Sequence, residues 1–486
     1  NIGLTNHKTH NPMKNYESLL TKIEECTEEF KKNWRFNEFE KSLTDAVNKH
    51  LAEHIQDVLE SVMQDKWFLS VLIALAGKQC LSFEGYRFVT VSVLNDQRIL
   101  ISTPYFYNRV KRRKSRKKKG RGAGNNIDCH LGLREIGMVS SYSGNLAREI
   151  CTMALLAPSE EMAVRLLSER GIVVDGKTLR KILRDVGQIG LSYRGMISVD
   201  QRQAGPSGTL VIAADGGRIR ERRPKPGRKP QDQTIQGYTT DWKEPVLFTM
   251  YVTDENGNVD RGFTPIYDAT MQGKEHAFEL LEKYLETLDT SAISRVMFCG
   301  DGAPWIWTRA EELLSRRFPD KQTYQVLDYT HAKQALEEIL DLLPARCKEA
   351  DKIREVFKEV LWKGQIDAME KLIRINFTGK RRDKAITKWQ NYFLANERRM
   401  QYSMFKGEGL PQGSGSVESG IRRVINLRLK SCGSFWKREN AEIYLFLRSQ
   451  LISGRWQIFF YNLTSRSDLF DCQVEIKSNH YLKWAA

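Results

Sequence analysis

The chain has 486 residues, of which 41% are apolar and 10% aromatic, a composition that excludes a disordered or fibrous protein and suffices for several domain cores. Lys and Arg number 76 against 60 Asp and Glu, so the formal net charge is +16, which favours a polyanionic partner. No run approaches the roughly 18 apolar residues of a membrane span, and the polar N-terminus lacks the apolar segment of a secretory signal. We therefore expect a soluble, cytoplasmic protein with no membrane partner.

The N-terminal part of the chain predicts helices followed by a β-hairpin. Over residues 13–70 apolar side chains recur at spacings of three and four, which is typical of two or three amphipathic helices. Residues 80–135 contain two alternating, β-branched runs on either side of Asn95-Asp96-Gln97, which predicts a hairpin. We assign these two ranges to an N-terminal helical region and to a hairpin that leads into a basic arm.

The basic arm is the densest run of positive charge in the chain. Ten of the thirteen residues from Arg109 to Arg121 are Lys or Arg. Such a block repels itself and does not pack, so it is either a solvated linker or a segment that binds phosphates without sequence specificity. We favour phosphate binding. The arm residues expected to contact DNA are Lys111, Arg112, Arg113, Lys114, Lys117, Lys118 and Lys119.

Residues 140–190 predict three short helices, the last two joined by a tight turn, with Ser159 and Asp175 as helix N-caps. This pattern is typical of a helix-turn-helix, although pairs of short helices also occur as simple packing units. In the DNA-binding interpretation the third helix enters a groove. It would present Lys177, Thr178, Arg180, Lys181 and Arg184.

The second half of the chain predicts an α/β domain. Three apolar strands each end in an aspartate: Asp215, Asp301 and Asp328. Because functional groups of α/β sheets gather at one set of strand ends, we expect these acids to converge. Charged helical periodicity without strands then indicates an all-helical insertion over 336–408. The α/β domain comprises 205–335 and 410–455, and 456–486 form a C-terminal tail.

A further acid, Glu418, is expected in the first turn of a helix that follows the Gly/Ser-rich segment 407–416. Two-metal phosphoryl transfer needs carboxylates that hold two Mg²⁺ about 3.5–4 Å apart, and oxygen ligands suit such ions. Arg422 lies four residues after Glu418, so the two side chains would share a helix face. Each acid alone has a structural alternative as a cap or turn residue. Glu408 is the alternative third acid.

Several motifs together resemble the DDE transposases of bacterial insertion sequences, near the ISKra branch. The motifs are Asp215-Gly-Gly, Cys299-Gly-Asp301-Gly-Ala-Pro-Trp-Ile-Trp, Leu327-Asp-Tyr-Thr-His331-Ala and Gly415-Ser-Val-Glu418-Ser-Gly, followed by Arg428-Leu-Lys430 and Trp436. The resemblance covers about residues 205–455 well, the helix-turn-helix moderately and the first 130 residues weakly. It implies an RNase-H-like mixed sheet flanked by helices and interrupted by the helical insertion.

By this resemblance Asp215, Asp301 and Glu418 are the catalytic residues and metal ligands, with two Mg²⁺ as cofactors and Mn²⁺ able to substitute. Asp328 and His331 match an accompanying Asp-x-x-His motif and take supporting roles. The resemblance implies DNA transposition and recombination at a mobile element: cleavage of element ends, then attack of the freed 3′-OH on target DNA.

The implied partners are double-stranded DNA and further copies of the chain, since synapsis of two ends needs at least a dimer; the DNA-bound protein would be nucleoid-associated. Six further basic residues are expected to contact the DNA: Arg218, Arg220, Arg422, Arg423, Arg428 and Lys430. The basic segment 218–229 is either a DNA-contacting arm or a solvated loop. Two other functions stay open: a stand-alone RNase-H-like nuclease, and a DNA-binding protein descended from a transposase that no longer has its chemistry.

Overall fold

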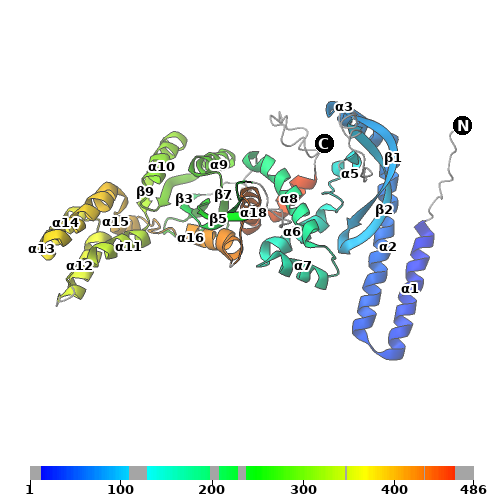
Figure 1. Cartoon of the computed structure of the whole chain (residues 1–486), viewed down its shortest axis with the longest axis horizontal. Coiled ribbons are helices and arrows are strands. Elements are labelled where there is room, and N and C mark those ends of the chain that lie inside the picture. The colour runs from blue at the N-terminus through cyan, green and yellow to red at the C-terminus, as the bar shows by residue number, and fades with distance from the viewer. Residues whose placement is uncertain are drawn as a thin grey trace. The chain divides into compact units, whose positions relative to one another are not determined.

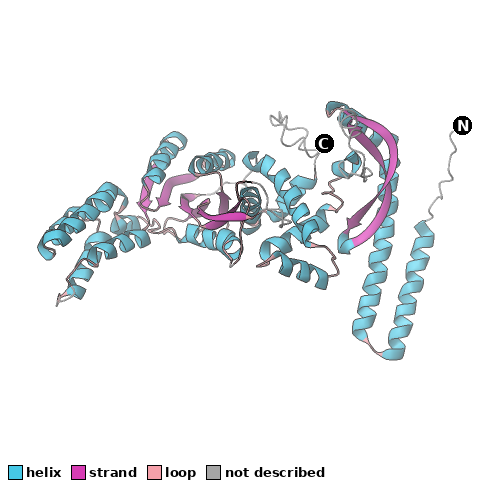
Figure 2. Ribbon diagram, viewed as in Figure 1, coloured by secondary structure: helices cyan, strands magenta, loops and turns pink. Residues whose placement is uncertain are grey.

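The computed structural model describes residues 12–108, 129–196, 207–227, 237–344, 347, 349–431 and 433–465. The chain divides into two compact units, Asn1–Val186 together with Gln457–Ala486, and Gly187–Trp456. Helices predominate in both (Figures 1 and 2). No helix among the described residues is long and apolar enough to cross a membrane. The basic arm from Arg109 to Arg121 lies outside the described residues.

The first unit begins with the predicted helices and hairpin. The elements are α1 (Pro12–Asn33), α2 (Phe36–Gln64), α3 (Lys66–Lys78), β1 (Leu81–Val93), the short η1 (Leu94–Asp96) and β2 (Gln97–Asn108). Strands β1 and β2 pair antiparallel. Asn95 and Asp96 both have positive φ, 58° and 53°, as a tight hairpin turn between right-twisted strands requires. Both the helical periodicity and the hairpin prediction are confirmed.

Three helices follow where the helix-turn-helix was expected. The unit continues with α5 (Leu131–Glu135), α6 (Gly144–Leu156), α7 (Glu160–Glu169) and the first part of α8 (Gly176–Tyr193). The rest of α8 and η3 (Arg194–Met196) belong to the second unit. Both predicted caps are confirmed: Ser159 Oγ accepts from Met162 N–H at 3.1 Å, and Asp175 Oδ1 accepts from Thr178 N–H at 2.7 Å.

The C-terminal segment differs from the predicted tail, because residues Trp456–Thr464 form helix α19. Thr464 at its end lies directly against Gly137 and Gly144, where an added Cβ would come within 2.4 and 2.5 Å of it. The apolar side chains of Phe459, Phe460 and Leu463 are buried. Tertiary packing, which a local pattern of nine residues does not reveal, therefore orders the start of this segment.

The second unit is built on a five-stranded mixed sheet with strand order β7-β6-β3-β8-β9. Its strands are β3 (Gly208–Gly216), β6 (Val246–Thr253), β7 (Ile266–Thr270), β8 (Ile293–Gly300) and β9 (Gln322–Leu327). Pairing is antiparallel for β3–β6 and β6–β7, and parallel for β3–β8 and β8–β9. Strand β3 is central and its residues Thr209–Ala214 are all buried, as its continuous apolar sequence predicted.

Helices cover both faces of this sheet (Figure 1). On one face Phe298 of β8 stacks on Phe278 of α9 (Lys274–Thr287) and contacts Trp307 of α10 (Pro304–Arg317). The opposite face is packed so closely by α16 (Gly415–Gly420) that a Cβ on Gly420 would meet Leu247 of β6 at 3.0 Å. The remaining C-terminal elements are η6 (Ile421–Asn426), α17 (Leu427–Leu429) and α18 (Arg438–Ile452).

Between β9 and α16 the described residues contain helices and no strand, as predicted for the insertion. The elements are α11 (Tyr329–Leu340), α12 (Ala350–Trp362), α13 (Ile366–Asn376), α14 (Gly379–Lys388), η4 (Trp389–Phe393), η5 (Leu394–Arg399) and α15 (Tyr402–Gly407). Phe357, Met369, Ile373 and Phe393 are buried, so the insertion has an apolar core of its own. Both η4 and η6 have the wider π-helical hydrogen-bond pattern.

The basic segment after Asp215 is a hairpin rather than the loop that the sequence indicated. Strands β4 (Ile219–Pro224) and β5 (Tyr238–Lys243) pair antiparallel. Charged residues on both faces of β4 obscure the alternation that marks a strand, and its partner lies too far along the chain for a tight-turn signal.

Candidate active site

The strand register brings three aspartates to one edge of the sheet. Ala213 of β3 pairs with Cys299 of β8, which pairs with Val326 of β9. Two residues further along, each parallel chain reaches an aspartate: Asp215, Asp301 and Asp328. Side chains two residues apart on a strand share a face, so the three carboxylates leave neighbouring strand ends on the same side.

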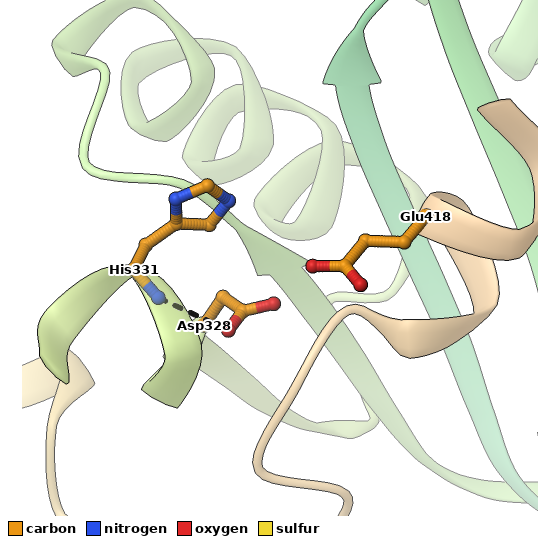
Figure 3. A group of neighbouring side chains, drawn as sticks. All are labelled: Asp328, His331 and Glu418. Carbon is orange, nitrogen blue, oxygen red and sulfur yellow. Dashed lines mark hydrogen bonds between the residues drawn. The ribbon is translucent and has the colours of Figure 1, made fainter. Parts of the chain in front are cut away.

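Glu418 joins this edge from helix α16. One carboxylate oxygen of Glu418, one oxygen of Asp328 and one ring nitrogen of His331 all lie within 4.8 Å of one another. Figure 3 shows the Glu418 side chain extended toward Asp328 and His331, which come from the start of α11. Glu418 is exposed, His331 half-buried and Asp328 buried.

The electrostatics of Asp215 show which other charges act on it. Its pKa is raised above the ordinary value, chiefly by burial and further by the negative charges of Asp301 and Glu418. A hydrogen bond from Gly216 N–H at 2.6 Å and the nearby His331 oppose this rise without cancelling it. The charges of Asp301 and Glu418 therefore act on Asp215 in the same direction as its burial.

Asp328 has a different environment, because its carboxylate is occupied by the protein itself. Oδ1 accepts from Thr330 N–H at 2.5 Å and caps α11, while Oδ2 accepts from Ser414 N–H at 2.7 Å and from the Ser414 hydroxyl. Burial raises the pKa of Asp328, but these hydrogen bonds outweigh burial and the net pKa is lowered. Asp328 thereby holds the segment before Glu418 against the end of β9, across 86 residues of sequence.

The two environments divide the acids by chemistry. Among the described residues, the group whose donor atoms all lie within 4.8 Å of one another is Asp328, His331 and Glu418, and Asp215 and Asp301 are not part of it. Asp215 and Asp301 lie at the ends of neighbouring strands and offer carboxylate oxygens, the ligand type that Mg²⁺ and Mn²⁺ prefer. Asp328 fits a positioning role, and His331 carries its imidazole to the same edge.

Glu408, the alternative third acid, lies elsewhere. Its carboxylate accepts a hydrogen bond from Tyr324 near the start of β9, and its backbone carbonyl accepts from Arg295 at 2.7 Å. Tyr324 and Arg295 lie toward the amino ends of β9 and β8, whereas the three aspartates lie at the carboxyl ends of their strands. Glu408 is therefore remote from the aspartates.

The helical insertion contacts the turn after Asp301, a feature that the sequence analysis did not anticipate. Asp301 Oδ1 accepts from Ala303 N–H at 2.8 Å, and a Cβ on Gly302 would lie 2.3 Å from Tyr392 Cε2. Burial raises the pKa of Tyr392, and so do the charges of Asp301 and Asp328. A pocket lies between these parts, lined by Asp301, Gly302, Ala303, His331, Gln334, Ala335, Glu338, Thr387, Lys388, Asn391, Tyr392 and Phe393.

The expected DNA-contacting residues differ in exposure. Among those described, nearly all have exposed side chains: Lys177, Arg180, Lys181, Arg184, Arg218, Arg220, Arg422, Arg423 and Lys430. Thr178 is half-buried at the start of α8. Arg180 pairs with Glu160 at 3.0 Å, and Lys181 donates to Ser140 Oγ at 2.9 Å, so both also hold neighbouring elements of the first unit.

Arg428 needs a correction, because it is buried and 3% exposed. Its guanidinium lies 5.4 Å from the ring centre of Trp436 and 5.1 Å from that of Tyr444. Arg428 therefore has a packing role and is not a surface contact for DNA. No ion pair joins Glu418 to Arg422 in the described part of the chain, since the helix changes to π-helical spacing at Ile421.

Comparison with known proteins gives no family assignment. No protein family matches the sequence, and no curated protein matches it. Among solved structures, a Drosophila P element transposase strand transfer complex aligns over 74% of this chain and 91% of that chain, with 11% identity and a TM-score of 0.21. At this TM-score the similarity is too slight to assign a fold or a function.

Replacement of Asp328 by Asn tests the hydrogen-bonded carboxylate. We expect a loss of about 1–3 kcal/mol in the free energy of unfolding at neutral pH, because an amide cannot accept all the bonds that the carboxylate accepts. Because the pKa of Asp328 is lowered in the folded protein, its carboxylate contributes its full stabilisation above the ordinary Asp pKa of about 4. This stabilisation is lost as the pH falls through the folded-state pKa of Asp328. Urea unfolding against pH measures it. The control is Asp320→Asn, an exposed aspartate; equal stability of both variants would contradict the assignment.

Replacement of Gly302 by Ala tests the contact between the insertion and the Asp301 turn. The new methyl group must displace the Tyr392 ring, so we expect a destabilisation of about 1–3 kcal/mol. In a Tyr392→Ala background the same change should cost little, and thermal unfolding of the four proteins gives the coupling. Gly216→Ala, with nothing within 4 Å of the added Cβ, is the matched control. Additive effects would show that Tyr392 does not pack over Gly302.

Proposed function

We propose that this protein is a DDE transposase of the insertion-sequence type, a metal-dependent enzyme that cleaves DNA strands at element ends and joins the freed 3′-OH to target DNA. The observation that carries the proposal is geometric: the register of β3, β8 and β9 is followed two residues on by Asp215, Asp301 and Asp328, and an oxygen of Glu418 lies within 4.8 Å of one of Asp328. The pKa of Asp215 is raised chiefly by burial and further by the charges of Asp301 and Glu418. A protein gains nothing in stability from clustering like charges, so a bound cation is the simplest reason for the cluster.

The sheet supports the same function. Numbered along the chain, the five strands have the order 3-2-1-4-5, with the first three antiparallel and the last two parallel to the first. This mixed sheet is consistent with the RNase-H-like core that we propose, and Asp215 and Asp301 lie at the carboxyl ends of its first and fourth strands. The insertion then leaves after the fifth strand and returns at Glu418.

Each residue has a defined task in this proposal. Asp215, Asp301 and Glu418 would hold two Mg²⁺, which when bound activate the attacking oxygen and stabilise the leaving oxygen of phosphoryl transfer. Asp328 fixes the helix start that carries His331 and the segment that leads to Glu418. His331, half-buried beside Glu418, would donate a hydrogen bond to a phosphate oxygen at this edge.

DNA would be held mainly through positive charge. The net charge of +16 and the exposed basic side chains Lys177, Arg184, Arg422 and Arg423 support phosphate contacts that are sequence-independent and salt-dependent. The α7–α8 pair would supply specific recognition of the element end by the helix-turn-helix geometry. Two such ends must meet for transposition, so we include at least a dimer in the proposal.

Asp301→Asn tests the chemistry. Nicking of supercoiled plasmid by the full chain with Mg²⁺ should fall by more than about 100-fold, since changes to residues that only hydrogen-bond to metal ligands already cost about 10–100-fold. Plasmid binding measured in EDTA should stay the same or strengthen, because one repulsive charge is gone.

Glu408→Gln is the matched control, because this acid lies at the other edge of the sheet and should leave nicking unchanged. Undiminished nicking by Asp301→Asn would contradict the metal site. Nicking without any joining of a 3′-OH end to plasmid would instead favour the stand-alone nuclease.

A further inference from the structure

The β4–β5 hairpin has two chemically different faces. On the inner face Ile219 and Glu221 are buried. Successive side chains of a strand alternate between faces, and the register pairs Arg220 with Trp242 and Arg222 with Thr240 on the outer side. Tyr238, four residues before Trp242, lies on that side too. The outer face thus combines arginines with two aromatic rings that are 46% and 43% exposed.

The two acids on the described strands of the hairpin, Glu221 and Asp241, are on the inner side, where each is ion-paired. Glu221 pairs with Arg438 at 3.0 Å and with Arg223 at 2.8 Å, and Asp241 pairs with Lys243 at 2.7 Å. By contrast, no ion pair with a carboxylate is formed by Arg218, Arg220 or Arg222 within the described ranges. The outer face of the described strands therefore presents positive charge that neither Glu221 nor Asp241 offsets.

These arginines lie over the exposed rings. The Arg220 guanidinium is 4.9 Å from the ring centre of Trp242 and 5.7 Å from that of Phe435, and Arg218 is 5.3 Å from Trp242. Arg222 lies 5.9 Å from Tyr238, whose ring is tilted against Phe435 at 5.8 Å. Such contacts limit the rotamers of the arginines, so guanidinium planes and aromatic rings form one ordered surface.

The hairpin is fixed to the elements that carry the acids. Arg222 N–H donates to Trp436 O at 2.8 Å, and Trp436 N–H donates to Arg220 O at 2.9 Å. Its first strand starts four residues after Asp215, and Gly217 lies against Ile425 of η6, the helical segment directly after α16 and Glu418. The hairpin is thus held by hydrogen bonds to the segment after α17 and lies close in sequence to Asp215.

We propose that this outer face binds single-stranded DNA, with bases stacked on Tyr238 and Trp242 and phosphates on Arg218, Arg220 and Arg222. In a duplex the faces of the bases are already stacked on one another, so exposed rings have nothing to stack on there. Unpaired bases do offer their faces, and arginine beside aromatic rings is the chemistry that binds them without regard to sequence. The choice of DNA rests on the proposed function, in which strand cleavage at the carboxylates frees a 3′-OH end, and the bases of this end must separate from the complementary strand to reach the hairpin.

The test is binding of the full chain in EDTA, where no cleavage occurs, to a fluorescein-labelled oligothymidylate and to a labelled duplex of the same length. For Tyr238→Ala/Trp242→Ala we expect the oligothymidylate affinity to fall at least about 25-fold, because base stacking gives about five- to hundredfold for each ring, and the duplex affinity to change less than about twofold. The matched control is Trp34→Ala/Trp67→Ala, which removes two exposed tryptophans, one between α1 and α2 and one in α3, and should change neither affinity.

The arginines have their own readout. Arg220→Gln/Arg222→Gln should reduce the slope of log affinity for oligothymidylate against log salt concentration by about 0.7 for each phosphate that is no longer neutralised. An equal loss of duplex and single-strand affinity in the aromatic variant would make the face a duplex-binding surface and overturn the proposal. An unchanged oligothymidylate affinity would overturn it as well.

Photocross-linking of the wild-type protein to an oligonucleotide with 5-iodouracil covers the case that the aromatic variant does not fold. Cross-links at Tyr238 or Trp242 support the stacking surface, and cross-links confined to other peptides contradict it. Asp301→Asn separates this inference from the proposed function: it should bind oligothymidylate like the wild type. If that variant still nicks DNA, the metal site is wrong, whereas the binding results on the hairpin stand.

Discussion

The arrangement of the candidate site depends on the hydrogen bonds of one buried carboxylate, that of Asp328. Its two oxygens hold the start of α11 on one side and Ser414 on the other, with Tyr329 N–H bound to Gln412 O at 3.0 Å beside them. The long helical insertion leaves and returns between these points. Without this closure, nothing local to Glu418 would bring it to the sheet edge where Asp215 and Asp301 end their strands.

Asp328 and Asp215 lie at the ends of parallel strands of the same sheet, but hydrogen bonding lowers the pKa of Asp328 and burial raises that of Asp215. Asp328 is buried, yet backbone and hydroxyl donors keep it ionised, so it contributes to stability. Asp215 is partly buried beside two other acids, and its ionisation carries a penalty that the protein alone does not relieve. The acids gather at this end of the sheet although the whole chain has a net charge of +16. A cation bound between these acids and a phosphate would balance the negative charge there.

Much of the fold could be predicted from the sequence, because strands β3, β8 and β9 are apolar runs that end at an aspartate and the helices have clear periodicity and caps. The elements that escaped prediction depend on distant partners. Hairpin β4–β5 carries charge on both faces, Arg428 is buried only because Trp436 and Tyr444 pack on it, and Tyr392 reaches Gly302 through the insertion. The sequence around Glu418 and Glu408 sufficed to prefer Glu418 as the third acid. That the two acids lie at opposite ends of β9 could be seen only in the structure.

The most direct test of the central claim is to locate the metal by anomalous X-ray diffraction from crystals of the full chain soaked in Mn²⁺. The account predicts anomalous peaks within coordination distance of Asp215, Asp301 and Glu418, with Asp328 still bound to Ser414 and outside the coordination shell. Peaks coordinated by Asp328 and His331 without Asp215, or no peak at this edge of the sheet, would contradict it.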